Sequence, residues 1–299
     1  MTHHPPDWEQ ANQVDVRPIL TLPPKIKGIN RPGSRVLERI ANFAQYLRGQ
    51  EYRCFGNDIY LAGMVEAGKL VFVTPNGFPS ASMLHSSPKP LYVRPSAEPI
   101  VHEFWEDMVV DQPDKETVRQ LGSCLYGAPF RYRTNKLKTD QDLDGLYSVF
   151  PNSEDPDSLI DEYWQLIPRQ ASDTLEACLV RYFNFVALHP FSDGNGRTAR
   201  ALLMADLART AECSFVYLPL AVVKRVWLPL ITEAERRLSL EREAAWADYV
   251  ALMIEMLDTA LGVAEASSGL PVSGDVHFHF KNDPCGARYA GSTVRGLVE

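Results

Sequence analysis

Apolar residues recur every three or four positions over most of the chain, which is the spacing of one face of an α-helix. This spacing predicts helices at 35–48, 98–110, 115–124, 155–167, 174–188, 197–211, 222–242 and 243–264. The clearest apolar stripes are Val36, Ile40, Phe43, Ala44 and Leu47 in the first helix, and Trp246, Val250, Met253, Leu257 and Leu261 in the last. Ser34 is placed to cap the first helix. We therefore expect a mainly α fold.

Strand signals are fewer and shorter. Residues 69–73 form the clearest apolar run, and residues 145–150 alternate before Pro151, which indicates a short hairpin or an edge strand. Residues 275–281 also alternate, and this places His277 and His279 on one face. Two histidines alone do not make a metal site, and the sequence offers no third ligand beside them.

Proline-rich and small-residue segments divide the chain into four parts. Residues 1–33 are expected to form an extended N-terminal arm. Residues 34–97 combine a helix with strand signals and are expected to form an α/β extension, a candidate region for recognising a partner. Residues 98–265 hold most of the predicted helices, and residues 266–299 are expected to form a linker and a C-terminal tail.

The bulk composition narrows the class of protein. The chain has 299 residues and a net charge of -8, which argues against nucleic acid as the main partner. No apolar run is long enough to span a membrane and the N-terminus lacks a signal-peptide pattern, so we expect a cytoplasmic protein that does not bind membranes. The five cysteines are scattered without metal-like spacing, as expected for reduced structural thiols.

The chemistry of the chain is concentrated between His189 and Arg200, in the sequence HPFSDGNGRTAR. Pro190 disfavours helical backbone at the preceding residue, so a helix is expected to end at His189 and to present its imidazole. The Gly-Asn-Gly turn at 194–196 allows backbone amides to converge, and a helix that begins near Arg197 adds its partial positive charge. Arg197 and Arg200 are neighbours on that helix. Together these features predict a polyphosphate site.

Asp193 adds a carboxylate directly before this anion site. The carboxylate would repel a phosphate unless a cation lay between them, and Mg²⁺ commonly bridges a carboxylate and nucleotide phosphates. The sequence therefore predicts a site for a Mg-nucleotide with a histidine beside it. Because a helix C-terminus and a bound polyphosphate both favour protonated imidazole, a His189 base needs some other influence that keeps it neutral.

Three other interpretations of this stretch were weighed. A helix-turn-helix corner explains the glycines but not the histidine, the aspartate and both arginines. A dinucleotide-binding turn fits Gly194, Gly196 and Ala199, but Pro190 interrupts the strand it requires, and no acidic residue ends a strand about 20 residues later. A module that binds nucleotide phosphates without chemistry remains open.

The stretch at 189–200 resembles the HPFx(D/E)GNGRxxR signature of Fic-domain proteins at every specified position. The apolar helix before it and the segment 145–150, where the family has a β-hairpin flap, support the resemblance over residues 98–212. The resemblance implies a Fic-like helical bundle at 98–265 with a short flap. The family's common reaction moves AMP from ATP to a Ser, Thr or Tyr hydroxyl of a target protein.

The resemblance also implies a role for each matching residue. His189 would be the catalytic base, and Asp193 would hold Mg²⁺ on the phosphates of ATP. The nucleotide's phosphates would be bound by Gly194, Asn195, Gly196, Arg197 and Arg200. The flap would pair with the target backbone through Leu146, Tyr147, Ser148, Val149 and Phe150.

The sequence departs from the family in its regulatory pattern. Many members carry an inhibitory helix, (S/T)xxxE(G/N), whose glutamate pairs with the second motif arginine, here Arg200. Fragments of that pattern begin at Ser34, Ser172 and Ser239, but none is completed. Glu38 is the best-placed candidate for the inhibitory glutamate. Control by a partner chain, control by self-association and the absence of control all stay open.

The expected activity is therefore protein adenylyl transfer with Mg²⁺ and ATP. The kinase-like Doc branch of the family has a lysine near Gly196, so phosphate transfer is disfavoured. Transfer of UMP or phosphocholine, and removal of AMP, stay open because the motif contacts phosphates and not the base. A catalytically silent nucleotide-binding regulatory module is the alternative from another class.

Overall fold

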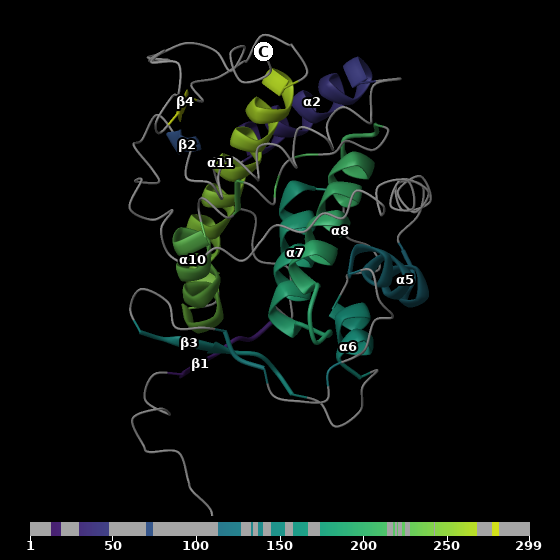
Figure 1. Ribbon diagram of the computed structural model, residues 1–299, viewed down its shortest axis with the longest axis vertical. Coiled ribbons are helices and arrows are strands. Elements are labelled where there is room, and N and C mark those ends of the chain that lie inside the picture. Colours follow the sequence, from purple (N-terminus) through teal and green to yellow (C-terminus); the bar gives the residue numbers. More distant parts are fainter. Residues whose placement is uncertain are drawn as a thin grey trace, which may run out of the picture.

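The computed structural model describes residues 13–18, 30–47, 70–73, 113–126, 133, 137–139, 145–152, 158–166, 174–213, 218, 220, 223–224, 228–241, 243–267 and 277–280. Its helices are α2 (Asn30–Leu47), α5 (Lys115–Tyr126), α6 (Ser158–Leu166), α7 (Leu175–Leu188), α8 (Asn195–Thr210), α10 (Leu228–Glu241) and α11 (Glu243–Ser267). The strands are β1 (Gln13–Asp15), β2 (Leu70–Val73), β3 (Tyr147–Val149) and β4 (His277–Phe280). The mainly α fold predicted from the sequence is confirmed (Figure 1). The helix predicted at 98–110 lies outside the described residues.

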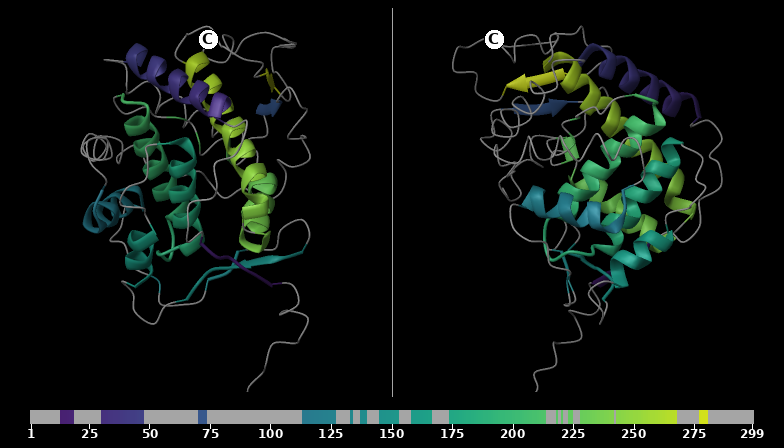
Figure 2. Two further views of the ribbon diagram at one scale, coloured as in Figure 1. Left: turned by 180° about the vertical axis from the view of Figure 1, so that it is seen from behind. Right: turned by 90° about the vertical axis from the view of Figure 1, so that its right-hand side faces the viewer.

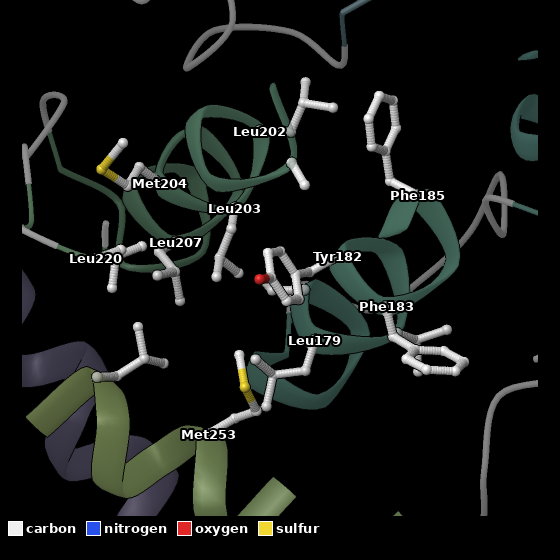
Figure 3. Close-up of a cluster of buried hydrophobic side chains, with 14 of the residues drawn as sticks. Leu179, Tyr182, Phe183, Phe185, Leu202, Leu203, Met204, Leu207, Leu220 and Met253 are labelled. Atoms are coloured by element: carbon white, nitrogen blue, oxygen red, sulfur yellow. The ribbon is translucent and has the colours of Figure 1, made fainter. Parts of the chain in front are cut away.

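Helix α7 is the centre of the bundle. Its N-cap Thr174 accepts a hydrogen bond from the amide of Ala177, and all but two of its residues are buried. A helix that is apolar on every face must be surrounded by other elements. Helix α8 packs along α7, and Figure 3 shows Leu179 and Tyr182 of α7 facing Leu203 of α8. The two helices that flank the HPFSDGNGRTAR motif are therefore held in the core.

Helix α2 belongs to the same hydrophobic core as α7 and α8. The sequence had assigned its residues to two N-terminal segments, 1–33 and 34–97. The helix packs against α11, α8 and α7, and its Ile40 and Phe43 are almost fully buried. Arg39 makes a buried ion pair with Glu265 of α11, with 2.7 Å between Nη2 and Oε2, and a second pair with Asp258. These contacts place residues from both sides of position 98, the predicted start of the helical domain, in one hydrophobic core.

The start of α2 was predicted wrongly. The helix begins at Asn30, so Ser34 lies inside it and is not its N-cap. Pro32 falls in the first turn, where a proline costs no intrahelical hydrogen bond, and the helix can therefore extend through it. Within the described part of the chain, no helix combines the length and the apolar character needed to cross a membrane.

Two small sheets complete the fold. Strand β3 pairs in parallel with β1, and the amide of Val16 donates to the carbonyl of Val149 at 2.8 Å. On its other edge β3 pairs with residues 137–139, where the amide of Phe150 donates to Leu137 O at 3.0 Å. The strand predicted near 145–150 is confirmed: β3 belongs to a two-stranded sheet with β1, and the bridge between Lys138 and Val149 adds an antiparallel contact on its other side. Figure 2 shows β1 and β3 at one end of the bundle and α2 at the opposite end.

The second sheet pairs β2 with β4 in antiparallel register, with Val71 opposite His279 and Val73 opposite His277. Strands were predicted at both places. Among the residues that the structure describes, no group of three or more His, Cys, Asp or Glu side chains could hold a metal ion.

Candidate functional site

His189 ends α7 at the position that Pro190 predicts, but its backbone is left-handed and not the extended conformation that a following proline favours. Its backbone has φ 50° and ψ 55°, in the left-handed region, and its amide donates to the carbonyl of Phe185 at the helix C-terminus. The ring nitrogen Nδ1 lies 3.2 Å from the carbonyl oxygen of Val186. Because a carbonyl only accepts, Nδ1 carries the proton in this hydrogen bond, and Nε2 of the neutral ring is left as the accepting nitrogen. This is the tautomer that a general base requires.

Two features hold the imidazole neutral. Phe150, which follows β3, stacks on the imidazole with ring centroids 4.0 Å apart. Burial is the main cause that lowers the pKa of His189, to about 4, and the positive charges of Arg133 and Lys224 lower it further. The Val186 carbonyl and the Asp193 carboxylate act in the opposite direction. The structure thus supplies the influence that a base at a helix C-terminus needs.

Lys224 is itself an ionic part of this region. Its Nζ donates to the Tyr182 hydroxyl at 2.8 Å and pairs with Glu235 Oε1 at 3.1 Å. Burial alone would lower the pKa of Lys224, but the Glu235 carboxylate holds it above its ordinary value, so the side chain stays charged. Its charge also interacts with Arg200. The positive charge of Lys224 therefore acts on both His189 and Arg200.

The loop between the two helices is held by Phe191 and Asn195. Phe191 is fully buried, and its backbone carbonyl and amide bond to the Asn195 side chain at 2.8 and 3.0 Å. Asn195 is 1 % exposed. Its side chain therefore fixes the loop, and only its backbone amide is available to the anion site that the motif predicts.

The anion site that the motif predicts would be the start of α8. Gly194 precedes the helix with φ 79°, a conformation that suits glycine. The first amide bonded back along the helix is that of Thr198, which donates to Gly194 O at 3.0 Å, so the amides of the preceding turn point out of the helix end. A Cβ at Gly196 would lie 3.3 Å from Arg200 Nη1. The glycine therefore lets this guanidinium lie against the first turn.

Asp193 stands at the exposed side of this helix start. Its side chain is 64 % exposed, Oδ2 lies 3.8 Å from Arg197 Nη2, and Oδ1 accepts from the Gly194 amide at 2.6 Å. Mg²⁺ is commonly bound by one or two carboxylates together with substrate phosphates, and keeps several waters. One accessible carboxylate beside an anion site fits that kind of metal binding.

The other predicted site residues lie on the flap, at 146–150, and on α2. Val149 and Phe150 of the predicted flap are buried, whereas Leu146, Tyr147 and Ser148 are partly exposed. Phe150 therefore contacts His189 and is not exposed.

Glu38 is exposed on α2, whose Gly33 lies beside Leu175 at the N-terminal end of α7. His189 is at the other end of that helix, about 20 Å away at 1.5 Å per residue. The inhibitory role of Glu38 towards Arg200 stays a prediction.

Sequence reasoning missed Arg133, Lys224 and the stacking role of Phe150. Neither Arg133 nor Lys224 belongs to a motif or an apolar stripe of the sequence. Both lie outside the motif in sequence, and Arg133 precedes His189 by 56 positions. Single residues so far from the motif form neither a periodic pattern nor a local motif, so the sequence does not indicate that they lie beside His189.

The comparisons with known proteins agree with this geometry. The model of the Fic/DOC family matches residues 112–206. Residues 112–206 are a Fic/DOC family domain. This domain contains α5, β3, α6, α7 and most of α8, including His189, Asp193 and both motif arginines.

The domain has a curated relative and a structural neighbour. Over 111 residues the chain is 32 % identical to protein adenylyltransferase fic-1 of Caenorhabditis briggsae, which covers 35 % of this chain and 20 % of that protein. The chain thus spans about a fifth of that relative's length. A Fic family protein from Desulfovibrio desulfuricans G20 superposes with a TM-score of 0.53 over 85 % of this chain and 79 % of its own, at 16 % identity. The Fic fold of the domain therefore extends to the helices that surround it.

Proposed function

We propose that the chain is a protein adenylyltransferase, which moves AMP from Mg-ATP to a Ser, Thr or Tyr hydroxyl of a target protein. The observation that carries the proposal is the neutral His189 with Nε2 as acceptor, next to a helix start equipped with Arg197 and Arg200. The name of the curated relative supports the same reaction for this Fic/DOC domain.

In the proposed step, His189 Nε2 takes the proton of the target hydroxyl while the hydroxyl oxygen attacks the α-phosphorus of ATP. A new oxygen–phosphorus bond forms, the bond from the α-phosphorus to the bridging oxygen breaks, and pyrophosphate leaves. The amides at the start of α8 and the two arginines bind the phosphates and stabilise the charge that develops on them. Asp193 would hold Mg²⁺, which neutralises phosphate charge when it is bound.

The target is proposed to dock at the flap, residues 146–150. Both edges of β3 are already paired, with β1 on one side and residues 137–139 on the other. A target strand would therefore have to replace β1, because the 137–139 side belongs to the hairpin itself. Replacement would release the Val16 amide from Val149, so amide exchange at Val16 should accelerate when a target binds, and unchanged exchange would place docking elsewhere.

The pH dependence follows from the lowered pKa of His189. The ordinary pKa of histidine is about 6.5, and burial lowers the pKa of this imidazole to about 4. The base is therefore neutral above that value, and kcat/KM for free enzyme should stay near its plateau at pH 5.5 and fall only as pH approaches 4. A half-maximal rate near pH 6.5 would contradict the structure, provided that circular dichroism shows the fold intact across this range.

The proposed function is tested by which phosphorus of ATP is transferred. The protein is incubated with Mg²⁺ and cell lysate, and with ATP labelled at the α-phosphorus or, in parallel, at the γ-phosphorus. Covalent label from the α-position alone is expected. Label from the γ-position alone would indicate phosphate transfer, and nucleotide binding without any transfer across several lysates would indicate a silent module.

A further inference from the structure

Arg133 lies between the flap and the end of α7. It is 3 % exposed, and its guanidinium donates from Nε to His189 O at 2.7 Å and from Nη2 to Leu188 O at 2.9 Å. Nη2 also donates to the carbonyl of Pro151, directly after Phe150. Its backbone amide donates to Pro190 O at 3.1 Å. One side chain thus binds both segments that enclose the imidazole.

The carbonyls that Arg133 binds are those that a helix leaves without an intrahelical partner. The last carbonyls of α7 carry the negative end of the helix dipole, and a guanidinium both satisfies and neutralises them. The His189 carbonyl is also part of a left-handed turn, which costs a non-glycine residue of order 1 kcal/mol or more and persists only when the surroundings hold it. Arg133 supplies such a hold on the backbone of the base.

The same side chain also binds the segment that carries the stacking ring of Phe150. Pro151 follows Phe150, whose ring stacks on the imidazole at 4.0 Å. Leu137, four residues after Arg133, accepts the Phe150 amide through its carbonyl, so the stacking ring is held through the Phe150 amide and through the Pro151 carbonyl. If the Pro151 carbonyl lost its donor, the stacking ring would lose one of these two attachments.

The charge of Arg133 adds to this effect. Burial lowers the pKa of the Arg133 guanidinium, but it stays far above neutral pH, and its positive charge disfavours a proton on His189. Lys224 acts in the same direction, whereas Asp193 and the Val186 carbonyl oppose both. Arg133 is therefore the group that combines a geometric and an electrostatic influence on the base.

We propose that Arg133 is a positioning residue that fixes the imidazole of His189 between the flap and α7, and so links the state of the flap to the base. Its effect on the rate rests on the proposed transfer reaction. Its effect on the imidazole does not, so the two can fail separately.

The test compares Arg133→Met and Arg133→Lys with the wild-type chain. Arg133→Met removes all guanidinium contacts, and we expect kcat to fall by up to about 100-fold. KM for ATP should stay nearly constant, because the phosphates bind at α8. Arg133→Lys keeps the charge but cannot bind both segments at once, so kcat should be intermediate. Arg237→Met, on a surface arginine paired with Glu241 and Asp248, is the matched control and should leave kcat unchanged.

A readout that needs no activity is the NMR titration of the His189 imidazole. In Arg133→Met the pKa of His189 should rise from about 4 towards its ordinary value, and in Arg237→Met it should not move. A folded Arg133→Met with the wild-type imidazole titration would overturn the proposal. If Arg133→Met does not fold, Arg133→Lys decides, since full kcat and an unchanged imidazole signal in that variant would overturn it equally. A shifted titration without any transfer activity in the wild type would reject the proposed function alone.

Discussion

His189→Ala is expected to lower the rate of AMP transfer by about 10²- to 10⁴-fold, the range for loss of a general base. Nucleotide binding should be retained, because the phosphates are bound by the start of α8 and by Arg197 and Arg200. Single-turnover transfer of α-labelled AMP measures the first effect, and calorimetric titration with Mg-ATP measures the second.

The matched control is another histidine-to-alanine change outside the site. His277 lies in β4, opposite Val73 of β2, and His277→Ala should transfer at the wild-type rate. If His189→Ala transferred as fast as this control, His189 would not be the base. If His189→Ala lost nucleotide binding together with transfer, the division of labour between α7 and α8 would be wrong.

Asp206→Ala is expected to cost about 3–5 kcal/mol of unfolding free energy, the range for removing one partner of a buried ion pair. Asp206 of α8 accepts from Arg181 Nε of α7 at 2.7 Å, and it also pairs with Arg209. The Arg181 side chain is 3 % exposed. Although burial alone would lower the pKa of Arg181, the Asp206 carboxylate holds it above its ordinary value. Without that carboxylate, a positive charge would remain buried between the two helices that carry the motif.

Urea unfolding followed by circular dichroism measures this loss. Asp248→Ala is the matched control, because the Arg237–Asp248 pair has side chains 40 % and 67 % exposed and such pairs contribute about 1 kcal/mol or less. The double variant Arg181→Met with Asp206→Leu removes both charges and should recover most of the stability. Equal losses in Asp206→Ala and Asp248→Ala would show that the buried pair does not hold α7 to α8.

The parts of the fold that could be predicted are those with local causes. The apolar stripe of α11 and the mostly apolar α7 follow from residue spacing. Pro190 determines where α7 ends, and Gly194 determines where α8 begins, since each restricts or permits backbone angles at its own position. These local rules were sufficient to place His189 at the end of α7 and Asp193 beside the start of α8, where we propose a base and a metal ligand.

The parts that could not be predicted depend on contacts between distant segments. Nothing in residues 13–16 indicates that they pair with β3, because a three-residue strand has too little pattern and its partner lies more than 130 residues away. The start of α2 was placed too late because Ser34 was taken as its N-cap and residues 1–33 as an extended arm, although the first helical turn tolerates Pro32. Arg133 illustrates the general limit, since its role depends on three carbonyls that only the folded chain brings within reach.

The central claim is tested most directly on the lysate protein that α-labelled ATP marks. That protein is purified and incubated with Mg-ATP and the enzyme, and its mass is then measured by mass spectrometry of the intact protein and of its peptides. The account predicts that the target gains the mass of one AMP on a Ser, Thr or Tyr side chain, and that this gain is absent with His189→Ala. A gain of one phosphate, or an AMP adduct that persists at the wild-type level with His189→Ala, would contradict it.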